Sequence, residues 1–171
     1  MTTTDHNQPE QDAPESVSHI GYPQPFADLA LTLCEASNRE LRIVSPALDH
    51  VVFDKRELAE ALSALARRRS NSRIRILIND SRAMVSHGHQ LLTLARRLPS
   101  SMSIRKLAHH PDMKGETILL GDNSHLLFMP AELDGGYYHP GSRASAQPYI
   151  DRFDDLWERA TEDPEFRQLG L

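Results

Sequence analysis

The sequence lacks the features that mark secreted proteins and membrane proteins. It has a single cysteine, Cys34, so no disulfide can form within the chain. No apolar run approaches the roughly 20 residues that a membrane helix needs, and the first residues have neither the basic start nor the apolar centre of a secretory signal. We therefore expect a cytoplasmic protein with no membrane contact. Because Cys34 lies in an apolar helical pattern, we expect a small buried hydrophobe rather than a nucleophile.

Aromatic residues are also scarce, at 6% of the chain, and most of them stand in patterns typical of a core. Stacking platforms for nucleic-acid bases are therefore not visible. A metal-ligand set is missing as well. His87 and His89 have no cysteine or acidic cluster beside them, and side chains two residues apart do not share a helix face. We expect neither a metal nor a cofactor.

Charge is unevenly distributed, although the formal net charge is only −5. Residues 1–25 carry four acids and no lysine or arginine, and residues 151–171 carry seven acids against three arginines. Residues 67–106 hold ten basic side chains, which are Arg67, Arg68, Arg69, Arg73, Arg75, Arg82, Arg96, Arg97, Arg105 and Lys106. The single acid of that segment is Asp80, so its balance is +9. Such a segment can attract phosphate, nucleic acid or an acidic partner surface, although charges on outer faces are often simply solvated.

The hydrophobic pattern predicts one α/β domain over residues 23–171. Residues 1–22 are rich in small polar residues and proline, so burying them could not offset the backbone entropy of ordering them, and we expect a disordered arm. We expect helices over 26–38, 55–69, 88–98 and 145–160, and strands over 40–46, 73–80, 102–107, 117–121 and 125–130, with a short edge strand near 135–138. The order of strand, helix, strand, helix, strand and hairpin predicts an α/β sandwich with a mixed sheet.

Three stretches carry a resemblance to a known superfamily. The resemblance is to one half of a phospholipase D superfamily protein, and it is carried by ELRIVSPALD, RIRILIND and YIDRFDDLWERA. In that superfamily each half ends in a helix with a Phe-x-x-Leu-Trp pattern, like Phe153 to Trp157 here. The segment from about 22 to 171, including GHQLLTLARRLPSSMSIRKL, also resembles an uncharacterised bacterial domain family, DUF7931, which is related to the phospholipase D fold. That resemblance implies an occasional acetyltransferase partner, since the family is sometimes joined to such domains. It also implies a homodimer, because superfamily members often place two halves face to face.

The superfamily's His-x-Lys-x-x-x-x-Asp motif is degenerate in this chain. In the superfamily the histidine acts as nucleophile or general acid, the lysine neutralises phosphate oxygens and the aspartate holds the histidine. If Asp122 is matched to the aspartate, the lysine position falls on Thr117 and the histidine position on Gly115. Registers that start at His109 or His110 do not restore the triad either. Asp122 is then most simply a turn residue that bonds its own backbone.

Two sets of residues nevertheless stay candidates for a site. His109, His110 and Lys114 could reach a displaced catalytic site that includes Asp122, although solvent-exposed loop histidines are the simpler interpretation. The second set would bind an anion through free backbone N–H groups at a helix start capped by Ser86. Its members are Arg82, His87, Gly88, His89, Arg96 and Arg97. Asp80 follows a strand, where α/β sheets often place ligand contacts, but capping a helix or pairing with Arg82 is an equal alternative.

These observations leave three functions open. The first is a non-catalytic phospholipase D-like domain that binds a phosphate-bearing ligand, a nucleic acid or a protein through its basic middle. The second is a phosphodiesterase or nuclease with a rearranged histidine site. The third is an interaction module for a separate acetyltransferase, because this chain has no glycine-rich acetyl-CoA loop of its own.

Overall fold

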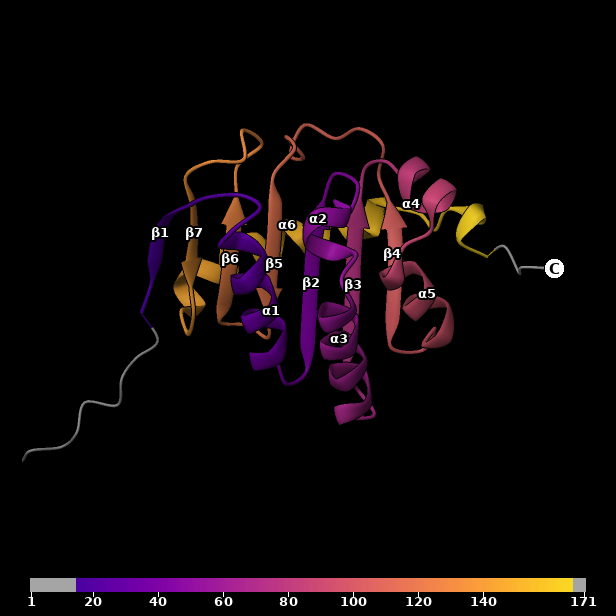
Figure 1. Cartoon of the computed structure of the whole chain (residues 1–171), viewed down its shortest axis with the longest axis horizontal. Coiled ribbons are helices and arrows are strands. Elements are labelled where there is room, and N and C mark those ends of the chain that lie inside the picture. The colour runs from indigo at the N-terminus through magenta and orange to yellow at the C-terminus, as the bar shows by residue number, and fades with distance from the viewer. Residues whose placement is uncertain (1–14, 168–171) are drawn as a thin grey trace, which may run out of the picture.

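The computed structural model describes residues 15–167, which fold into one seven-stranded sheet covered by helices on both faces (Figure 1). The strands are β1 (Val17–Ile20), β2 (Glu40–Ser45), β3 (Arg73–Ile78), β4 (Met102–Lys106), β5 (Thr117–Gly121), β6 (His125–Met129) and β7 (Gly136–His139). The helices are α1 (Phe26–Ala36), α2 (His50–Phe53), α3 (Arg56–Arg68), α4 (Arg82–His87), α5 (Gln90–Arg97), α6 (Arg143–Arg159) and the short 3-10 helix η1 (Pro164–Arg167). This arrangement confirms the predicted α/β sandwich.

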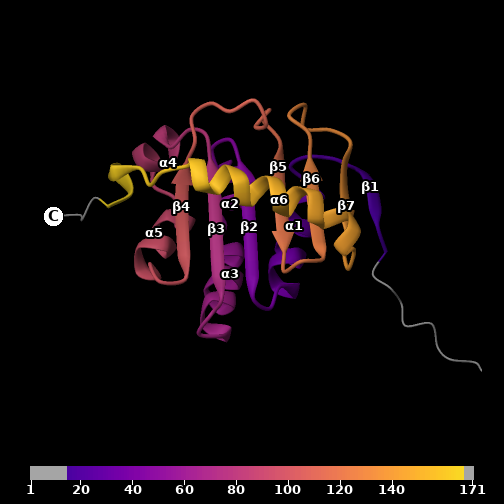
Figure 2. The same ribbon diagram turned by 180° about the vertical axis from the view of Figure 1, so that it is seen from behind.

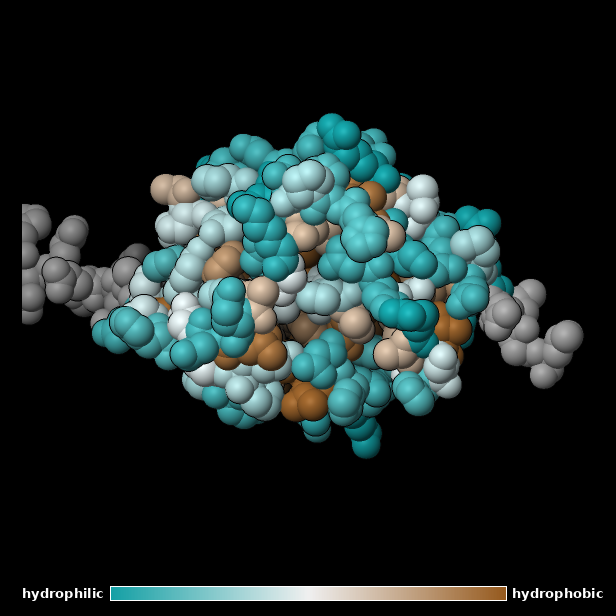
Figure 3. Space-filling view, turned by 90° about the horizontal axis from the view of Figure 1, so that it is seen from above, coloured by the Kyte–Doolittle hydropathy of each residue, from teal (hydrophilic) through white to brown (hydrophobic). Residues whose placement is uncertain are grey.

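The sheet is mixed, with strand order β1-β7-β6-β5-β2-β3-β4. β2, β3 and β4 are parallel, and their carboxyl ends meet at the upper end of the sheet in Figure 1. The β5–β6 hairpin and β7 run antiparallel to their neighbours. Seen from above, the loops over the upper end form a largely hydrophilic surface with scattered apolar residues (Figure 3).

Two hydrophobic cores lie on the two faces of the sheet. α1, α3 and α5 cover one face, where Leu62 and Ile76 are completely buried. On the other face α6 crosses the strands (Figure 2), and Phe153 and Trp157 pack against Leu77. β3 is thus apolar toward both layers, as the sequence RIRILIND predicts for an inner strand. Cys34 is buried within α1, which confirms its predicted role as a small hydrophobe.

Several short elements differ from the sequence prediction. Within the predicted arm, Val17–Ile20 forms β1 and pairs antiparallel with β7, while residues 1–14 lie outside the described part of the chain. The predicted edge strand, β7, is consequently an inner strand. α2, α4 and η1 are additional short helices of four, six and four residues. Each of these elements is too short for a periodic pattern, and β1 is ordered by backbone pairing with a strand more than a hundred residues away.

Within residues 15–167, no helix combines the length and the apolar character that crossing a bilayer requires.

Candidate functional site

The loop that carries His109, His110 and Lys114 spans the upper end of the sheet between β4 and β5 (Figure 1). The Asn79 side chain anchors it by donating to the carbonyl of Leu107 at 3.0 Å. His109 and His110 line an open depression of about 490 Å³ beside Asn79. The Nδ1 atom of His110 already accepts the N–H of Asp112 at 3.1 Å, which is a local turn contact.

Asp122 lies at the opposite end of β5 from this loop. The strand between them has five residues, so the separation along it is about 17 Å. The Asp122 carboxylate accepts the backbone N–H groups of Asn38, Arg39 and Glu40 at 3.1, 2.9 and 3.1 Å. Asp122 is therefore a turn residue with a φ of 50°, but its carboxylate binds the α1–β2 loop rather than its own backbone. The structure does not gather His109, His110, Lys114 and Asp122 into one site.

The positions that match the motif's histidine and lysine are also filled differently. Gly115 has a φ of 90°, and a Cβ atom there would lie 3.1 Å from the Cβ of Ala131. A larger side chain at residue 115 would therefore be strained and crowded. Thr117 begins β5 and is buried, with 4% of its surface exposed. Neither position carries an imidazole or an ammonium group, and Thr117, the one with a hydroxyl, is buried.

The start of α5, where the sequence suggested free N–H groups, is already capped. The Asp54 carboxylate accepts the N–H of Gln90 at 2.9 Å, and Nδ1 of His89 accepts the N–H of Leu91 at 3.0 Å. Because Nδ1 is an acceptor, Nε2 of His89 carries the proton and donates to the carbonyl of Leu48 at 3.0 Å. Burial lowers the pKa of His89, which favours this neutral form. Ser86 lies inside α4 and caps nothing, contrary to the prediction.

Four of the six predicted anion-binding residues do line one depression, of about 460 Å³: His87, Gly88, His89 and Arg97. The other two turn away. Arg82 donates to Asp80 at 2.6 Å, and Arg96 donates to the carbonyl of Phe166 at 2.7 Å. The hydrogen bonds from Arg82 lower the pKa of Asp80 to about 2, and Asp80 also accepts the N–H of Arg82, so both alternatives for this aspartate apply.

A neighbouring cavity of about 530 Å³ lies over the carboxyl ends of β2 and β3. Leu48 and Met84 form part of its apolar wall, and Asp49 and Asp54 contribute carboxylates. Its lining includes no lysine or arginine. This cavity therefore does not itself offer the positive potential that a phosphate needs. Across residues 15–167, no group of three histidine, cysteine or acidic side chains is placed to hold a metal ion.

Five of the ten basic side chains of residues 67–106 bond to other elements of the fold. They are Arg68, Arg75, Arg96, Arg105 and Lys106, and their partners are carbonyl oxygens, an amide oxygen or carboxylates. Arg67 and Arg82 make only local contacts, with Ser63 and Asp80. Arg75 is an example of a basic side chain used for packing. It lies under α6 beside Arg42, and both side chains contact Asp154. Burial, and then repulsion from Arg42 and Arg73, lowers the pKa of Arg75. Much of the basic segment therefore holds α6 and η1 to the sheet.

A group of exposed arginines, which includes Arg68, gathers at the lower end of the sheet, opposite the depressions. We call this surface the arginine end, and its members are Arg39, Arg67, Arg68, Arg69 and Arg73. The α3 terminus and the starts of β2 and β3 meet there: Arg68 donates to the carbonyl of Ser37 at 2.6 Å, and the N–H of Arg73 donates to the carbonyl of Arg39 at 2.9 Å. All five side chains are exposed, and none forms an ion pair with any carboxylate of residues 15–167. Sequence reasoning found four of the five, but Arg39 joins them only through the pairing of β2 with β3.

Comparison with known proteins gives a family and a fold. The model of a domain of unknown function, DUF7931, matches residues 22–169. None of the curated proteins matches the sequence. Three solved structures that share the fold are TrmBL2, described as an archaeal chromatin protein with a novel mode of DNA binding, and two proteins named Nuc and NucT.

The three likenesses rest on structure rather than sequence. TrmBL2 has 12% identity and a TM-score of 0.65, over 90% of this chain and 56% of TrmBL2. Nuc from Salmonella typhimurium, a phospholipase D family member, has 15% identity and a TM-score of 0.62, over 87% of this chain and 99% of Nuc. NucT from Helicobacter pylori has 9% identity and a TM-score of 0.59, over 87% of this chain and 99% of NucT. The expected phospholipase D-like fold is thus confirmed.

Proposed function

Because the chain belongs to the DUF7931 family of domains of unknown function, we propose a function from its own surface: it binds a phosphate-bearing polymer at the arginine end and does not cleave it. The observation that carries this proposal is the exposed arginine end, whose five guanidinium groups have no carboxylate partner within residues 15–167. Two acids lie at this end, Glu35 on the last turn of α1 and Asp122, whose carboxylate accepts the N–H of Arg39, so the five arginines keep a balance of +3 over them.

The shape of this surface favours a polymer over a single small anion. None of the cavities that line the upper end or the β4 edge includes an arginine-end residue. Guanidinium groups spread over an open surface match the repeated phosphates of a nucleic-acid backbone better than one enclosed phosphate. No aromatic side chain of residues 15–167 is fully exposed, so contacts would be made to phosphates rather than by base stacking. The preference for sequence would then be weak.

The absence of cleavage is proposed from the motif positions. Gly115 and Thr117 supply neither the imidazole nor the ammonium group of the motif, and Asp122 is committed to three backbone N–H groups at the far end of β5. TrmBL2, described as an archaeal chromatin protein with a novel mode of DNA binding, has a similar fold. Its example is compatible with a phospholipase D-like fold that holds DNA, although at this identity the likeness concerns the fold alone.

The experiment compares two triple variants that change the net charge equally. Arg67→Gln, Arg69→Gln and Arg73→Gln remove charge at the arginine end, whereas Arg56→Gln, Arg143→Gln and Arg159→Gln remove exposed arginines elsewhere. We measure fluorescence anisotropy of a labelled single-stranded oligonucleotide over a salt series. Each lost phosphate contact reduces the slope of log K against log salt by about 0.7, so the first variant should lose about 2 in slope and the control almost nothing. Equal losses in the two variants would overturn the proposal.

The phosphodiesterase that the sequence left open has one observation in its favour, namely that His109 and His110 share a depression with Asn79. Purified protein is incubated with bis-p-nitrophenyl phosphate, alongside the double variant His109→Ala and His110→Ala. Hydrolysis that disappears in the double variant would establish this alternative. No turnover, or turnover that the double variant retains, would end it.

Two partner predictions stay as sequence-based proposals. The homodimer is tested by light scattering at micromolar concentration, where a monomeric mass would remove it. The acetyltransferase partner is tested by co-purification from cells, where failure to recover any such enzyme would count against it.

A further inference from the structure

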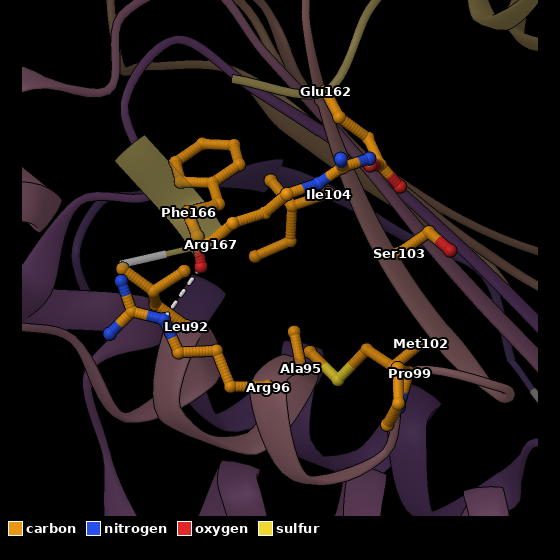
Figure 4. Close-up of a pocket in the computed structure, with 10 residues that line it drawn as sticks. All are labelled: Leu92, Ala95, Arg96, Pro99, Met102, Ser103, Ile104, Glu162, Phe166 and Arg167. Atoms are coloured by element: carbon orange, nitrogen blue, oxygen red, sulfur yellow. Dashed lines mark hydrogen bonds and ion pairs between the residues drawn. The ribbon is translucent and has the colours of Figure 1, made fainter. Parts of the chain in front are cut away.

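A hollow of about 300 Å³ follows the β4 edge of the sheet, between α5 and η1 (Figure 4). β4 is the last strand in the sheet order, so one side of its backbone has no neighbouring strand. The apolar side chains that line the hollow are Leu92, Ala95, Pro99, Met102, Ile104 and Phe166. Figure 4 shows them around a central space that no labelled side chain fills.

The backbone groups of β4 alternate between β3 and this hollow. The N–H of Leu107 donates to the carbonyl of Ile78 on β3 at 2.9 Å, so the odd-numbered residues face inward. Lys106 instead exchanges two hydrogen bonds with Thr161, of 2.7 and 3.1 Å, on the outer side. Because backbone direction alternates along a strand, Ile104 also faces outward. Its N–H and carbonyl have no hydrogen-bond partner among residues 15–167.

The chain itself covers this edge at its two ends, where Lys106 pairs with Thr161 and the N–H of Met102 donates to the carbonyl of Leu98 at 2.9 Å. After the antiparallel bridge between Lys106 and Thr161, Asp163 accepts the hydroxyl of Ser81 at 2.6 Å, and Pro164 begins η1. Proline has no N–H to donate to a ladder, and η1 packs against α5 instead of β4. The open part of the outer β4 backbone is therefore the carbonyl of Met102 with the N–H and carbonyl of Ile104, a short strand edge that is a template for another strand.

The rim of the hollow is positively charged. Arg96 donates through Nε and Nη2 to the carbonyls of Phe166 and Glu165, at 2.7 and 3.2 Å. These acceptors are neutral, and Arg96 pairs with no carboxylate of residues 15–167. Arg167 also lines the hollow, but it is paired with Glu162. The three charged groups of the rim thus sum to +1, which favours an occupant that carries a carboxylate.

We propose that this hollow binds an extended peptide segment of a partner protein, which adds to β4 as a strand. An apolar side chain of the peptide fills the space beside Ala95 and Met102, and an acidic side chain lies near Arg96. α5 and η1 wall the hollow on two sides (Figure 4). A second copy of this chain could offer its own β4 only with the same two walls attached, so a slender single segment fits better. The site is separate from the arginine end and does not depend on it.

The test uses a labelled pentapeptide of alternating valine and acidic residues, Val-Asp-Val-Glu-Val with blocked ends, and its counterpart with lysine at both acidic positions. Fluorescence polarisation measures binding to the full chain. The acidic peptide should bind at least about tenfold more tightly than the lysine peptide. In an NMR titration, the amide resonance of Ile104 should shift and its hydrogen exchange should slow, because the peptide carbonyl accepts that N–H. Equal affinity for the two peptides, or an unchanged Ile104 amide, would overturn the proposal.

Variants separate a bound strand from general attraction. Arg96→Gln should weaken the acidic peptide about tenfold, whereas Arg97→Gln, which removes the neighbouring exposed charge outside the hollow, should leave its affinity unchanged. Ala95→Trp should abolish peptide binding, because the larger side chain fills the space. This variant removes no hydrogen bond, so it still tests the site if Arg96→Gln disturbs the packing of η1. Binding that survives Ala95→Trp would refute the site. Two other results would also refute it. If Ala95→Trp dissociated a dimer, the hollow would bind a second copy of the chain. If the peptide bound only after deletion of residues 168–171, the hollow would bind that segment.

Discussion

Replacing Asp122 tests whether this aspartate is structural, as its contacts indicate. Its carboxylate accepts three backbone N–H groups of the α1–β2 loop. Because that loop is close to the surface, water can partly replace each lost bond, so we assign about 1 kcal/mol to each. An alanine at a φ of 50° adds about 1 kcal/mol of backbone strain. Asp122→Ala should therefore lower the free energy of unfolding by about 4 kcal/mol, which corresponds to roughly 8–16 °C in Tm for a chain of this size.

Two further substitutions divide this loss into its parts. Asp122→Gly tolerates the positive φ but loses the three hydrogen bonds, so it should cost about 3 kcal/mol. Asp122→Asn keeps one acceptor oxygen and tolerates the backbone conformation, so it should cost only about 1–2 kcal/mol.

The assay is urea unfolding followed by circular dichroism. Asp134→Ala is the control, since the Asp134 carboxylate accepts only the N–H of Gly135, and it should cost less than about 1 kcal/mol. If Asp122→Ala were as stable as Asp134→Ala, the carboxylate would not hold the α1–β2 loop. A catalytic role for Asp122 would then have to be reconsidered.

Two further predictions concern the packing and the pH dependence of the fold. Gly136→Ala should lower the free energy of unfolding by about 1–3 kcal/mol, because its Cβ would lie 2.6 Å from the carbonyl oxygen of Phe128. Gly135→Ala has no atom within 4 Å of its Cβ but a φ of 73°, so it should lower that free energy by about 1 kcal/mol in the same urea assay. The neutral form of His89 should stabilise the fold fully above pH ~6.5, the pKa of an unfolded histidine. That contribution should be lost as the pH falls through the lower pKa of the folded state, because the unfolded chain binds the proton first. Urea unfolding at pH 7.5 and 5.5 should therefore show a smaller acid-induced loss for His89→Asn than for the native chain, and an equal loss would contradict the lowered pKa of His89.

Local patterns in the sequence predict much of the fold. Leu58, Leu62 and Leu65 repeat at helical spacing and are buried on one face of α3, as predicted. The alternation in RIRILIND likewise identifies an inner strand. β1 escapes prediction because its order depends on a partner distant in sequence, β7.

The candidate sites depend more strongly on contacts between distant residues. Asp54 caps a helix that begins 36 residues later, so the sequence shows the N–H groups of α5 but not the carboxylate that occupies them. Arg39 joins the arginine end only through parallel pairing, and the basic segment gives no sign that Arg75 and Arg105 are held beneath α6. Charge counted along the chain therefore overstates the positive surface and misplaces part of it.

Binding without cleavage is tested most directly by following one labelled single-stranded oligonucleotide in two ways at once. Its anisotropy is measured with the native protein over a salt series, and its length is checked on a denaturing gel after the same incubation. We predict binding whose affinity falls steeply as salt rises, with the strand intact throughout. A shortened strand, or binding that is insensitive to salt, would contradict the proposed function.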